Sequence, residues 1–303
     1  MYFIGVTTRK SSIMRIFPAW AEIFGLQPAE LLGVDVPPHA NPAIYRRTVT
    51  QIKLDPLSLG ATVTTHKVDL LAATRDLFEE LDPNAELCQE VSNIAKRDGR
   101  LIGFAKDPET SGRTIREMVE PGHWRRTGGH VLCLGAGGTT RAIAAYLLRQ
   151  PDPAERPDRF IAIGRSVQSL TRLRSVIDGI GGPVEVDYVL NDEPARNDEL
   201  VSRLPPGSLV VNATGMGKDR PGSPITTEAV FPERGVVWEL NYRGELGFLH
   251  QAETQAIARS LRVFDGWRYF VHGWIDHVAE VFDVDVDATL FARLAHAADA
   301  IRA

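Results

Sequence analysis

The 303-residue sequence predicts an α/β fold with two domains. A chain of this length is larger than most single hydrophobic cores. From Phe160 to Asn212, short apolar runs of strand length alternate with stretches in which apolar residues recur every three or four positions. This alternation is typical of a parallel sheet covered by helices. A glycine-rich turn joins the apolar run Val131–Leu134 to a helical stretch, which is how a β-α-β unit opens.

The first 120 residues also alternate between the two periodicities, but they carry no glycine fingerprint of their own. Their apolar pattern predicts strands over Tyr2–Thr7 and Leu59–Thr64 and helices over Met14–Phe24 and Val68–Leu81. We therefore expect residues 1–120 to form a first α/β domain.

Residues 121–272 are expected to form the second domain, which begins at the turn-rich segment Pro121–Gly129. The elements predicted within it are the strands Val131–Leu134, Phe160–Ile163, Ser208–Val211 and Val236–Trp238 and the helices Thr139–Arg149 and Val167–Ile177. From Gly273 onward the pattern predicts one or two amphipathic helices. We expect this C-terminal segment, 273–303, to return to the first domain.

The composition is that of an ordinary globular protein, with 44% hydrophobic and 24% charged residues. A net charge of −5 argues against a nucleic-acid or anionic-membrane partner, because both require a positive field. Two cysteines, Cys88 and Cys133, form neither a disulfide framework nor a metal-ligand pattern. With no signal-peptide core and no apolar stretch of spanning length, we expect a cytoplasmic monomer or homodimer.

The turn after Val131–Leu134 has the sequence Gly135-Ala136-Gly137-Gly138-Thr139 and opens a helix. In this context the first glycine permits a sharp turn, and the second lets the backbone approach a pyrophosphate. The helix N-terminus offers free N–H groups and a partial positive charge to phosphates. The alternative is a tight strand-to-helix turn without a ligand, and the strand–loop–helix context favours dinucleotide binding over it.

Arg165 and Ser166 follow the next predicted strand, where the adenosine ribose of a dinucleotide would lie. An acidic residue there would repel a 2′-phosphate, whereas an arginine beside a hydroxyl would bind one. We therefore expect NADP as the cofactor, with NAD as the alternative. The competing interpretation is that Arg165 is a solvated surface residue.

Two further strand ends are candidates for the nicotinamide half of the cofactor site. Asn212, Ala213 and Thr214 follow one strand, and Glu239–Tyr242 ends another. Small residues and glycines after a strand permit close backbone approach. Both segments are equally consistent with ordinary turns.

Taken together, these segments make the chain resemble shikimate and quinate dehydrogenases over nearly its whole length. The resemblance is carried by Gly60–Lys67, Asp98–Gly103 leading to Asp107, the Gly135–Ala142 loop, Gly164–Ser166, Asn212–Thr214 and Gly266–His272. It implies a substrate-binding first domain, a Rossmann-like second domain that includes Gly266 in its cofactor site, and a C-terminal helix that packs on the first domain.

The resemblance implies that Lys67 is the catalytic lysine and Asp107 its carboxylate partner. A lysine can transfer the proton of an alcohol, while the cofactor carries the hydride. Without the family pattern, Lys67 reads as a surface lysine and Asp107 as a helix cap.

Substrate-binding positions are implied in the same way. Thr62 stands where the family has a substrate-binding Asn, Ser92 or Asn93 where it has a second one, and Ser11 where it has the first of two carboxylate-binding serines. The aromatic segment Gly266–Trp274, with Tyr242 and His272 as polar groups, is expected either to line a substrate pocket or to pack in the core.

The departures from the family pattern are concentrated in the substrate pocket. Ile13 stands where the second serine is expected, and it cannot hydrogen-bond a carboxylate. The lysine loop lacks the usual proline before His66, Lys106 precedes Asp107 in place of threonine, and Gly273 falls where a glutamine is expected. The type of reaction therefore transfers better than the substrate.

The resemblance implies an NADP-dependent oxidoreductase that interconverts a secondary alcohol and a ketone on a shikimate-, quinate- or cyclitol-like small molecule. It would thereby serve aromatic amino acid biosynthesis or quinate metabolism. Two alternatives remain open. One is a dehydrogenase on the same scaffold with an unrelated substrate, such as a folate- or pterin-linked unit. The other is an NADP-binding sensor without catalysis.

Overall fold

The computed structural model describes residues 1–218 and 220–302, and the chain divides into two compact units. The first unit contains Met1–Lys106 and Val271–Ala303, and the second contains Asp107–Phe270. Helix α5 (Asp107–Met118) belongs to the second unit, because Gly112 allows the ring of Tyr146 on α7 (Gly138–Leu147) to pack directly against it. The segment Pro121–Gly129, expected at the domain boundary, consequently lies inside the second unit.

Within its described residues, the first unit contains a mixed six-stranded sheet in the order β2-β1-β3-β5-β6-β4. Its strands are β1 (Tyr2–Gly5), β2 (Leu32–Asp35), β3 (Gly60–Val63), β4 (Glu80–Leu81), β5 (Asn93–Arg97) and β6 (Arg100–Phe104). Strand β1 runs parallel to β2 and β3, and β5 is antiparallel to β3 and β6. Asp98 and Gly99 both have positive φ, 50° and 76°, which is the conformation that a two-residue hairpin turn requires.

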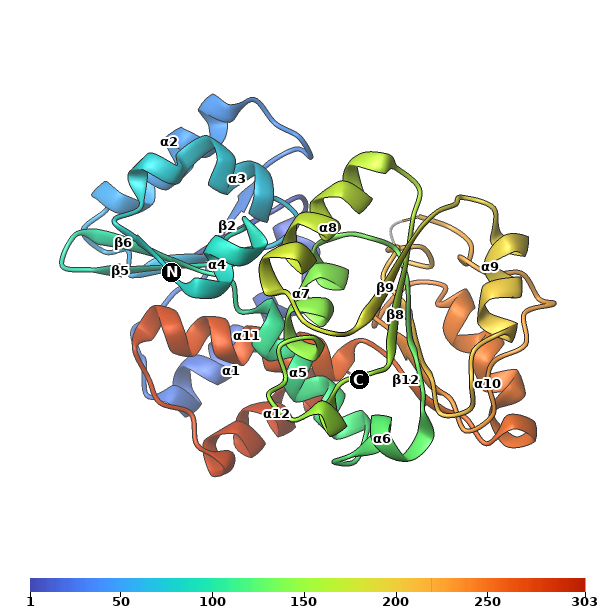
Figure 1. Ribbon diagram of the computed structural model, residues 1–303. Coiled ribbons are helices and arrows are strands. Elements are labelled where there is room, and N and C mark those ends of the chain that lie inside the picture. Colours follow the sequence, from blue (N-terminus) through green and yellow to red (C-terminus); the bar gives the residue numbers. More distant parts are fainter. Residues whose placement is uncertain (219, 303) are drawn as a thin grey trace. The chain divides into compact units, whose positions relative to one another are not determined.

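Helices cover both faces of this first sheet (Figure 1). On one face, α2 (Pro42–Leu54) and α3 (Lys67–Thr74) contribute to a buried apolar cluster with β1 and β3. The other face carries α1 (Ile13–Phe24), α12 (Ala288–Arg302) and the part of α11 (Trp267–Phe282) from Val271 onward. The Trp20 indole N–H on α1 donates to the carbonyl of Leu294 on α12 over 2.8 Å. The C-terminal helices therefore complete the core of the first unit.

The helix predicted over Val68–Leu81 is wrong in its second half. Helix α3 ends at Thr74, whose hydroxyl donates to the Leu70 carbonyl, and Leu81 instead belongs to β4 and pairs with Gly103. The apolar spacing continues past Thr74, but pairing with β6 determines the conformation of the last residues. A short helix, α4 (Pro83–Cys88), then begins at the Asp82 cap.

The second unit is built on a parallel six-stranded sheet, counted over the part of the chain that the structure describes. Its strands are β7 (Val131–Leu134), β8 (Arg159–Gly164), β9 (Glu185–Leu190), β10 (Leu209–Asn212), β11 (Val236–Glu239) and β12 (Arg262–Phe264). Their order is β12-β11-β10-β7-β8-β9, and each neighbouring pair of these strands is parallel. This is the 3-2-1-4-5-6 order of a doubly wound Rossmann sheet, which confirms the predicted fold class.

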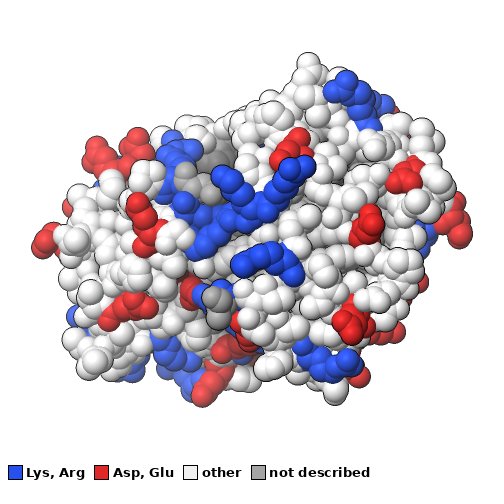
Figure 2. Space-filling view, turned by 180° about the vertical axis from the view of Figure 1, so that it is seen from behind, with Lys and Arg blue, Asp and Glu red and all other residues white. Residues whose placement is uncertain are grey.

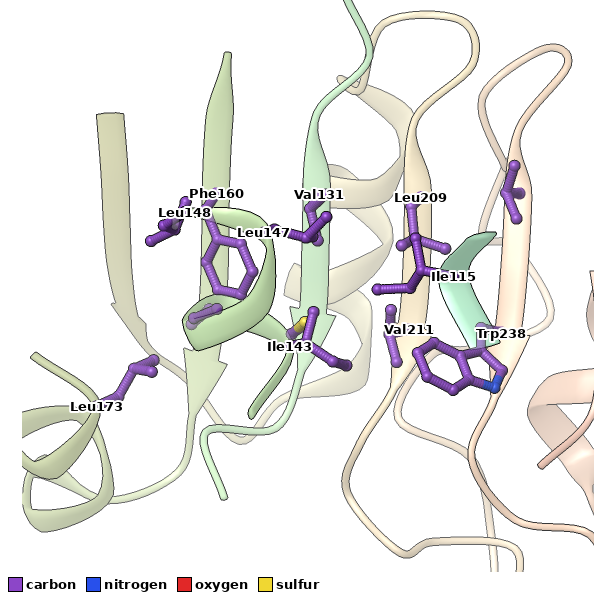
Figure 3. Packing of buried hydrophobic residues seen from close by; sticks show 14 of the residues in the cluster. Ile115, Val131, Ile143, Leu147, Leu148, Phe160, Leu173, Leu209, Val211 and Trp238 are labelled. Carbon is purple, nitrogen blue, oxygen red and sulfur yellow. The ribbon is translucent and has the colours of Figure 1, made fainter. Parts of the chain in front are cut away.

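Alternate side chains of each central strand face opposite helical layers. Val131 and Cys133 of β7 join the cluster formed with α5, α7 and α8 (Val167–Ile180), which Figure 3 shows from close by. Leu132 and Leu134 instead face α9 (Pro194–Ser202) and α10 (Gly247–Arg259). The remaining helix, α6 (His123–Thr127), adds Trp124 to the first cluster. The sheet is thus buried on both faces, as its near-continuous apolar strands predict.

Over residues 1–218 and 220–302, no helix combines the length and the apolarity that crossing a bilayer requires. Figure 2 shows Lys and Arg side chains interspersed with Asp and Glu side chains over the surface in view.

Candidate functional site

A cavity of about 560 Å³ lies in the second unit, at the carboxyl ends of β7, β8 and β10. Strand order reverses between β7 and β10, and ligands of open α/β sheets bind outside the carboxyl ends at such a point. Seven of the residues predicted to bind the cofactor line the cavity: Gly135, Ala136, Gly137, Arg165, Ser166, Ala213 and Thr214.

The glycine loop shapes one wall of the cavity. Gly135 has φ +114°, and a Cβ there would lie 2.5 Å from the Ala213 carbonyl oxygen, so that only glycine fits. Gly137 differs, because an added Cβ would meet no heavy atom within 4 Å. The Thr140 hydroxyl donates to the Gly135 carbonyl over 2.7 Å and fixes the loop to α7.

Helix α7 begins at Gly138 and Thr139, so that its first backbone N–H groups follow directly on the cavity wall. A helix N-terminus provides unpaired N–H donors and a partial positive charge. Together with the open space at Gly137, this arrangement fits the pyrophosphate of a dinucleotide. Over the described part of the chain, no group of three or more His, Cys, Asp and Glu side chains is arranged to hold a metal ion.

The rim at the ends of β8 and β9 carries charged groups. Arg165 is exposed, and the Ser166 hydroxyl caps α8 by accepting from the Ser169 backbone N–H over 3.2 Å. Asp192 and Arg220 also line the cavity and were missed in the sequence. The strand-end rule could have identified Asp192, which follows β9, whereas no motif signals Arg220 in the loop beyond β10.

Two residues that were predicted to bind the cofactor, Asn212 and Gly266, are not among the described residues that line the cavity. Asn212 is fully buried, and its Oδ1 accepts from the backbone N–H and hydroxyl of Thr214, over 3.1 and 2.6 Å. Gly266 packs on the backbone after β11, where a Cβ would lie 2.0 Å from the Leu240 carbonyl oxygen. Asn212 thus supports the cavity wall from behind, whereas cofactor binding by Gly266 stays a prediction.

Two candidate substrate-binding residues lie side by side in the first unit. Thr62 and Asn93 are paired across β3 and β5, and both are fully buried. The Asn93 amide donates to the His277 carbonyl over 2.9 Å. Among the described residues, Thr62 Oγ1 and Asn93 Oδ1 have no hydrogen-bond partner, which is costly for buried polar atoms unless a ligand or water completes them.

The other predicted substrate residues have different surroundings. Ser92 is fully buried, and its hydroxyl accepts from the Lys106 backbone N–H over 2.9 Å. Ser11 is half-buried just before α1, and Ile13 is fully buried at the start of that helix. Lys106 forms an ion pair with Glu280 over 2.6 Å.

Lys67 is the first residue of α3 and is half-buried in the first unit. Asp107 is the first residue of α5 and is buried in the second unit. Each therefore stands on a helix N-terminus, a rigid mounting for a functional side chain. Their pairing stays a prediction.

The aromatic segment forms the first turns of α11, which starts at Trp267 and not at Gly273 as predicted. In the second unit, the Tyr242 ring packs on Phe270 with centroids 4.7 Å apart and on Trp267 with centroids 5.4 Å apart. In the first unit, the buried His272 ring stacks on Phe291, with centroids 4.7 Å apart. Tyr242 and His272 therefore both pack against aromatic rings, and their predicted contact with a substrate stays a prediction.

The sheet order, the glycine loop and the cavity define the second unit as a Rossmann-like unit of the kind that binds nicotinamide dinucleotides. No protein-family model matches the chain. Its sequence is 28% identical over 181 residues to shikimate dehydrogenase (NADP(+)) of Streptococcus thermophilus, covering 59% of each chain. With the corresponding protein of Symbiobacterium thermophilum it is 30% identical over 188 residues, covering 61% of this chain and 58% of that one. The chain thus spans less than two thirds of these relatives.

Solved structures match nearly the whole chain. Shikimate dehydrogenase from Aquifex aeolicus superposes with a TM-score of 0.73 at 17% identity, covering 97% of this chain and 96% of that one. Quinate dehydrogenase from Corynebacterium glutamicum, solved with NAD, gives 0.73 at 19% identity over 98% and 96%. The 5-ketofructose reductase of a Gluconobacter strain gives 0.70 at 19% identity over 99% and 97%. These comparisons confirm the fold and the predicted resemblance to shikimate and quinate dehydrogenases.

Proposed function

We propose that the protein is an NADP-dependent oxidoreductase that interconverts a secondary alcohol and a ketone on a shikimate-, quinate- or cyclitol-like substrate. The observation that carries this proposal is the cavity at the strand-order reversal, with its glycine loop and Arg165 on the rim. The names of the sequence relatives, which are NADP(+)-dependent shikimate dehydrogenases, support the same reaction and cofactor.

When bound, the nicotinamide supplies or accepts the hydride. The chain's own residues bind and orient it: the α7 N-terminus and Gly137 receive the pyrophosphate, and Arg165 with Ser166 receives a 2′-phosphate. In the first unit, Thr62 Oγ1 and Asn93 Oδ1 are suited to hydrogen-bond substrate hydroxyls. Lys67 transfers the alcohol proton, with Asp107 as its carboxylate partner.

The cofactor proposal predicts that NADPH binds more tightly than NADH in a fluorescence titration. Arg165→Ala should weaken NADPH binding by roughly tenfold or more, because a charge-assisted contact to the 2′-phosphate is lost, and should leave NADH affinity nearly unchanged. Arg172→Ala, which removes an exposed arginine from α8, the helix that follows Arg165, is the matched control. Equal losses for the two cofactors would remove the basis for 2′-phosphate recognition.

The proton-transfer proposal predicts that Lys67→Ala lowers kcat by roughly 10²- to 10⁴-fold, with the NADPH dissociation constant unchanged. The activity is measured on a panel of cyclic polyols and their ketones by nicotinamide absorbance. Lys53→Ala removes a lysine from the same unit that forms a surface ion pair with Glu79, and it should retain wild-type kcat. Substantial turnover by Lys67→Ala would refute the assignment. NADPH binding without turnover on any substrate would favour a sensor.

A neutral polyhydroxy ketone is a second candidate substrate, favoured by one observation. Ile13, at the position implied for a carboxylate-binding serine, is fully buried at the start of α1. The Gluconobacter structural neighbour is named as acting on 5-ketofructose. Parallel assays with quinate, shikimate and uncharged ketoses distinguish the two classes, because a site without carboxylate contacts should turn over the uncharged compounds at least as well.

A further inference from the structure

Glu239, the last residue of β11, is a fully buried carboxylate in the second unit. Its Oε2 accepts from the Asn212 side-chain amide over 2.6 Å. Its Oε1 accepts from the backbone N–H and the side-chain amide of Asn241, each over 2.7 Å. The carboxylate thus connects the ends of two adjacent strands, β10 and β11. The donors in these three hydrogen bonds are all uncharged amide N–H groups.

Both asparagines in turn hold the turn that follows β10. The Oδ1 of Asn212 accepts from Thr214, while the Asn212 and Asn241 amides donate to the Met216 carbonyl over 3.3 and 2.9 Å. The Met216 backbone N–H donates to the Thr214 hydroxyl over 3.1 Å. Ala213, Thr214 and Met216 line the cavity. Glu239 therefore acts on the cavity wall through its two partners.

This wall faces a defined part of the ligand. The glycine loop after β7 receives the pyrophosphate, and Arg165 after β8 marks the adenosine side. Strands β10 and β11 lie on the opposite side of β7 from β8. The turn at 213–216 is therefore the contact for the nicotinamide half.

From this geometry we propose that Glu239 is a positioning residue of the dinucleotide site, holding the Ala213–Met216 turn in the shape that receives the nicotinamide half. The inference rests on the proposed dinucleotide function and adds to it a specific role for the side chain of Glu239, the first residue of the segment Glu239–Tyr242. In each of the three hydrogen bonds described above, the carboxylate oxygen accepts from an N–H donor, so the ionised form satisfies all three. A protonated carboxyl would place a donor against one of them.

The ionisation of Glu239 changes near neutral pH. The pKa of Glu239 is raised to about 7, because burial and, to a smaller extent, the charge of Asp265 raise it by more than the hydrogen bonds from Asn241 and Asn212 lower it. Asp265 is the charged group that acts on Glu239 from the segment before α11. Binding that depends on the ionised carboxylate should weaken as pH falls through about 7.

The test is a fluorescence titration of the full chain with NADPH at pH values from 6 to 8.5. Glu239→Gln should weaken NADPH binding by about tenfold at pH 8.5, since the Gln amide opposes the Asn212 amide. The difference in affinity between wild type and variant should shrink toward pH 6, where the wild-type carboxyl is protonated. Titration of the cofactor's own phosphate affects both proteins and cancels in this difference. Glu228→Gln, which removes an exposed carboxylate, should match wild type throughout.

A swapped pair separates positioning from general damage to the fold. In Glu239→Gln combined with Asn212→Asp, the Gln amide donates to the new carboxylate, so the 2.6 Å contact is restored in reverse. NADPH binding should recover only in part, because the Asn212 amide that donates to the Met216 carbonyl is lost while the Asn241 amide still donates to it. If Glu239→Gln does not fold, Glu239→Asp retains the charge but shortens its reach, and should bind more weakly with a wild-type pH profile. Wild-type affinity and pH dependence in a folded Glu239 variant would overturn the positioning role alone. Failure of the wild-type protein to bind NADPH or NADH would overturn the proposed function, and this inference with it.

Discussion

Two glycines in one loop have different reasons to be glycine. Gly135 is constrained by the fold, because its φ is +114° and the Ala213 carbonyl occupies the space of a side chain. Gly137 is unconstrained by its protein neighbours, with open space where its Cβ would stand. A sequence motif does not distinguish the two glycines. Their surroundings in the structure show that the fold requires a glycine at 135, whereas at 137 the space is open for a ligand.

This difference predicts opposite outcomes for two alanine substitutions. Gly135→Ala should lower the free energy of unfolding by about 3 kcal/mol, from positive φ and overpacking together, as measured by chemical denaturation. Gly137→Ala should leave that free energy within about 1 kcal/mol of wild type but weaken NADPH binding roughly tenfold, because its methyl group enters the phosphate site. Unchanged NADPH affinity in Gly137→Ala would show that the loop does not approach the cofactor as proposed.

At the scale of elements, the sequence predicts the bounds of a strand or helix best where its apolar pattern matches the burial of that element in the structure. The strand Val131–Leu134 has its predicted bounds because it is buried on both faces and is ended by the glycine loop. The helix predicted over Val68–Leu81 is half wrong because β4 is determined by pairing with β6, which lies some twenty residues along the chain. Local spacing carries no information about such a partner.

The candidate site was predictable to a similar extent. Residues that follow a strand directly, such as Gly135, Arg165 and Ala213, were predicted and line the cavity. Arg220 was missed because it lies in an irregular loop, and the role inferred for Glu239 was missed because it consists of contacts between strand ends. Asn212 was correctly predicted to lie near the cavity. Its side chain does not line the cavity but supports the lining residue Thr214 from behind.

At the scale of the whole molecule, the buried carboxyl of Glu239 links stability to pH. Its pKa in the folded protein is about 7, above its ordinary value of 4.5. A raised folded-state pKa contributes stability that is fully present below pH 4.5 and is lost as pH rises through about 7. Wild type should therefore lose on the order of 3 kcal/mol relative to Glu239→Gln between pH 4.5 and 8.5, as measured by denaturation at several pH values.

The comparison with the variant is necessary because other groups titrate in the opposite sense. Burial lowers the pKa of His66, His123 and His130, so their contribution to stability is lost as pH falls below about 6.5. These histidines are present in both proteins and cancel in the difference. A difference in stability that does not change with pH would mean that the carboxyl keeps its ordinary pKa.

The first unit is assembled from two segments of chain, 1–106 and 271–303, whereas the second is continuous. On the ribosome, the leading segment emerges long before α11 and α12, which carry the partners of Trp20 and Asn93. The second unit has its whole sequence available earlier. The core of the first unit therefore cannot be completed until α11 and α12 have been synthesised, whereas all residues of the second unit precede those of α12 in the chain.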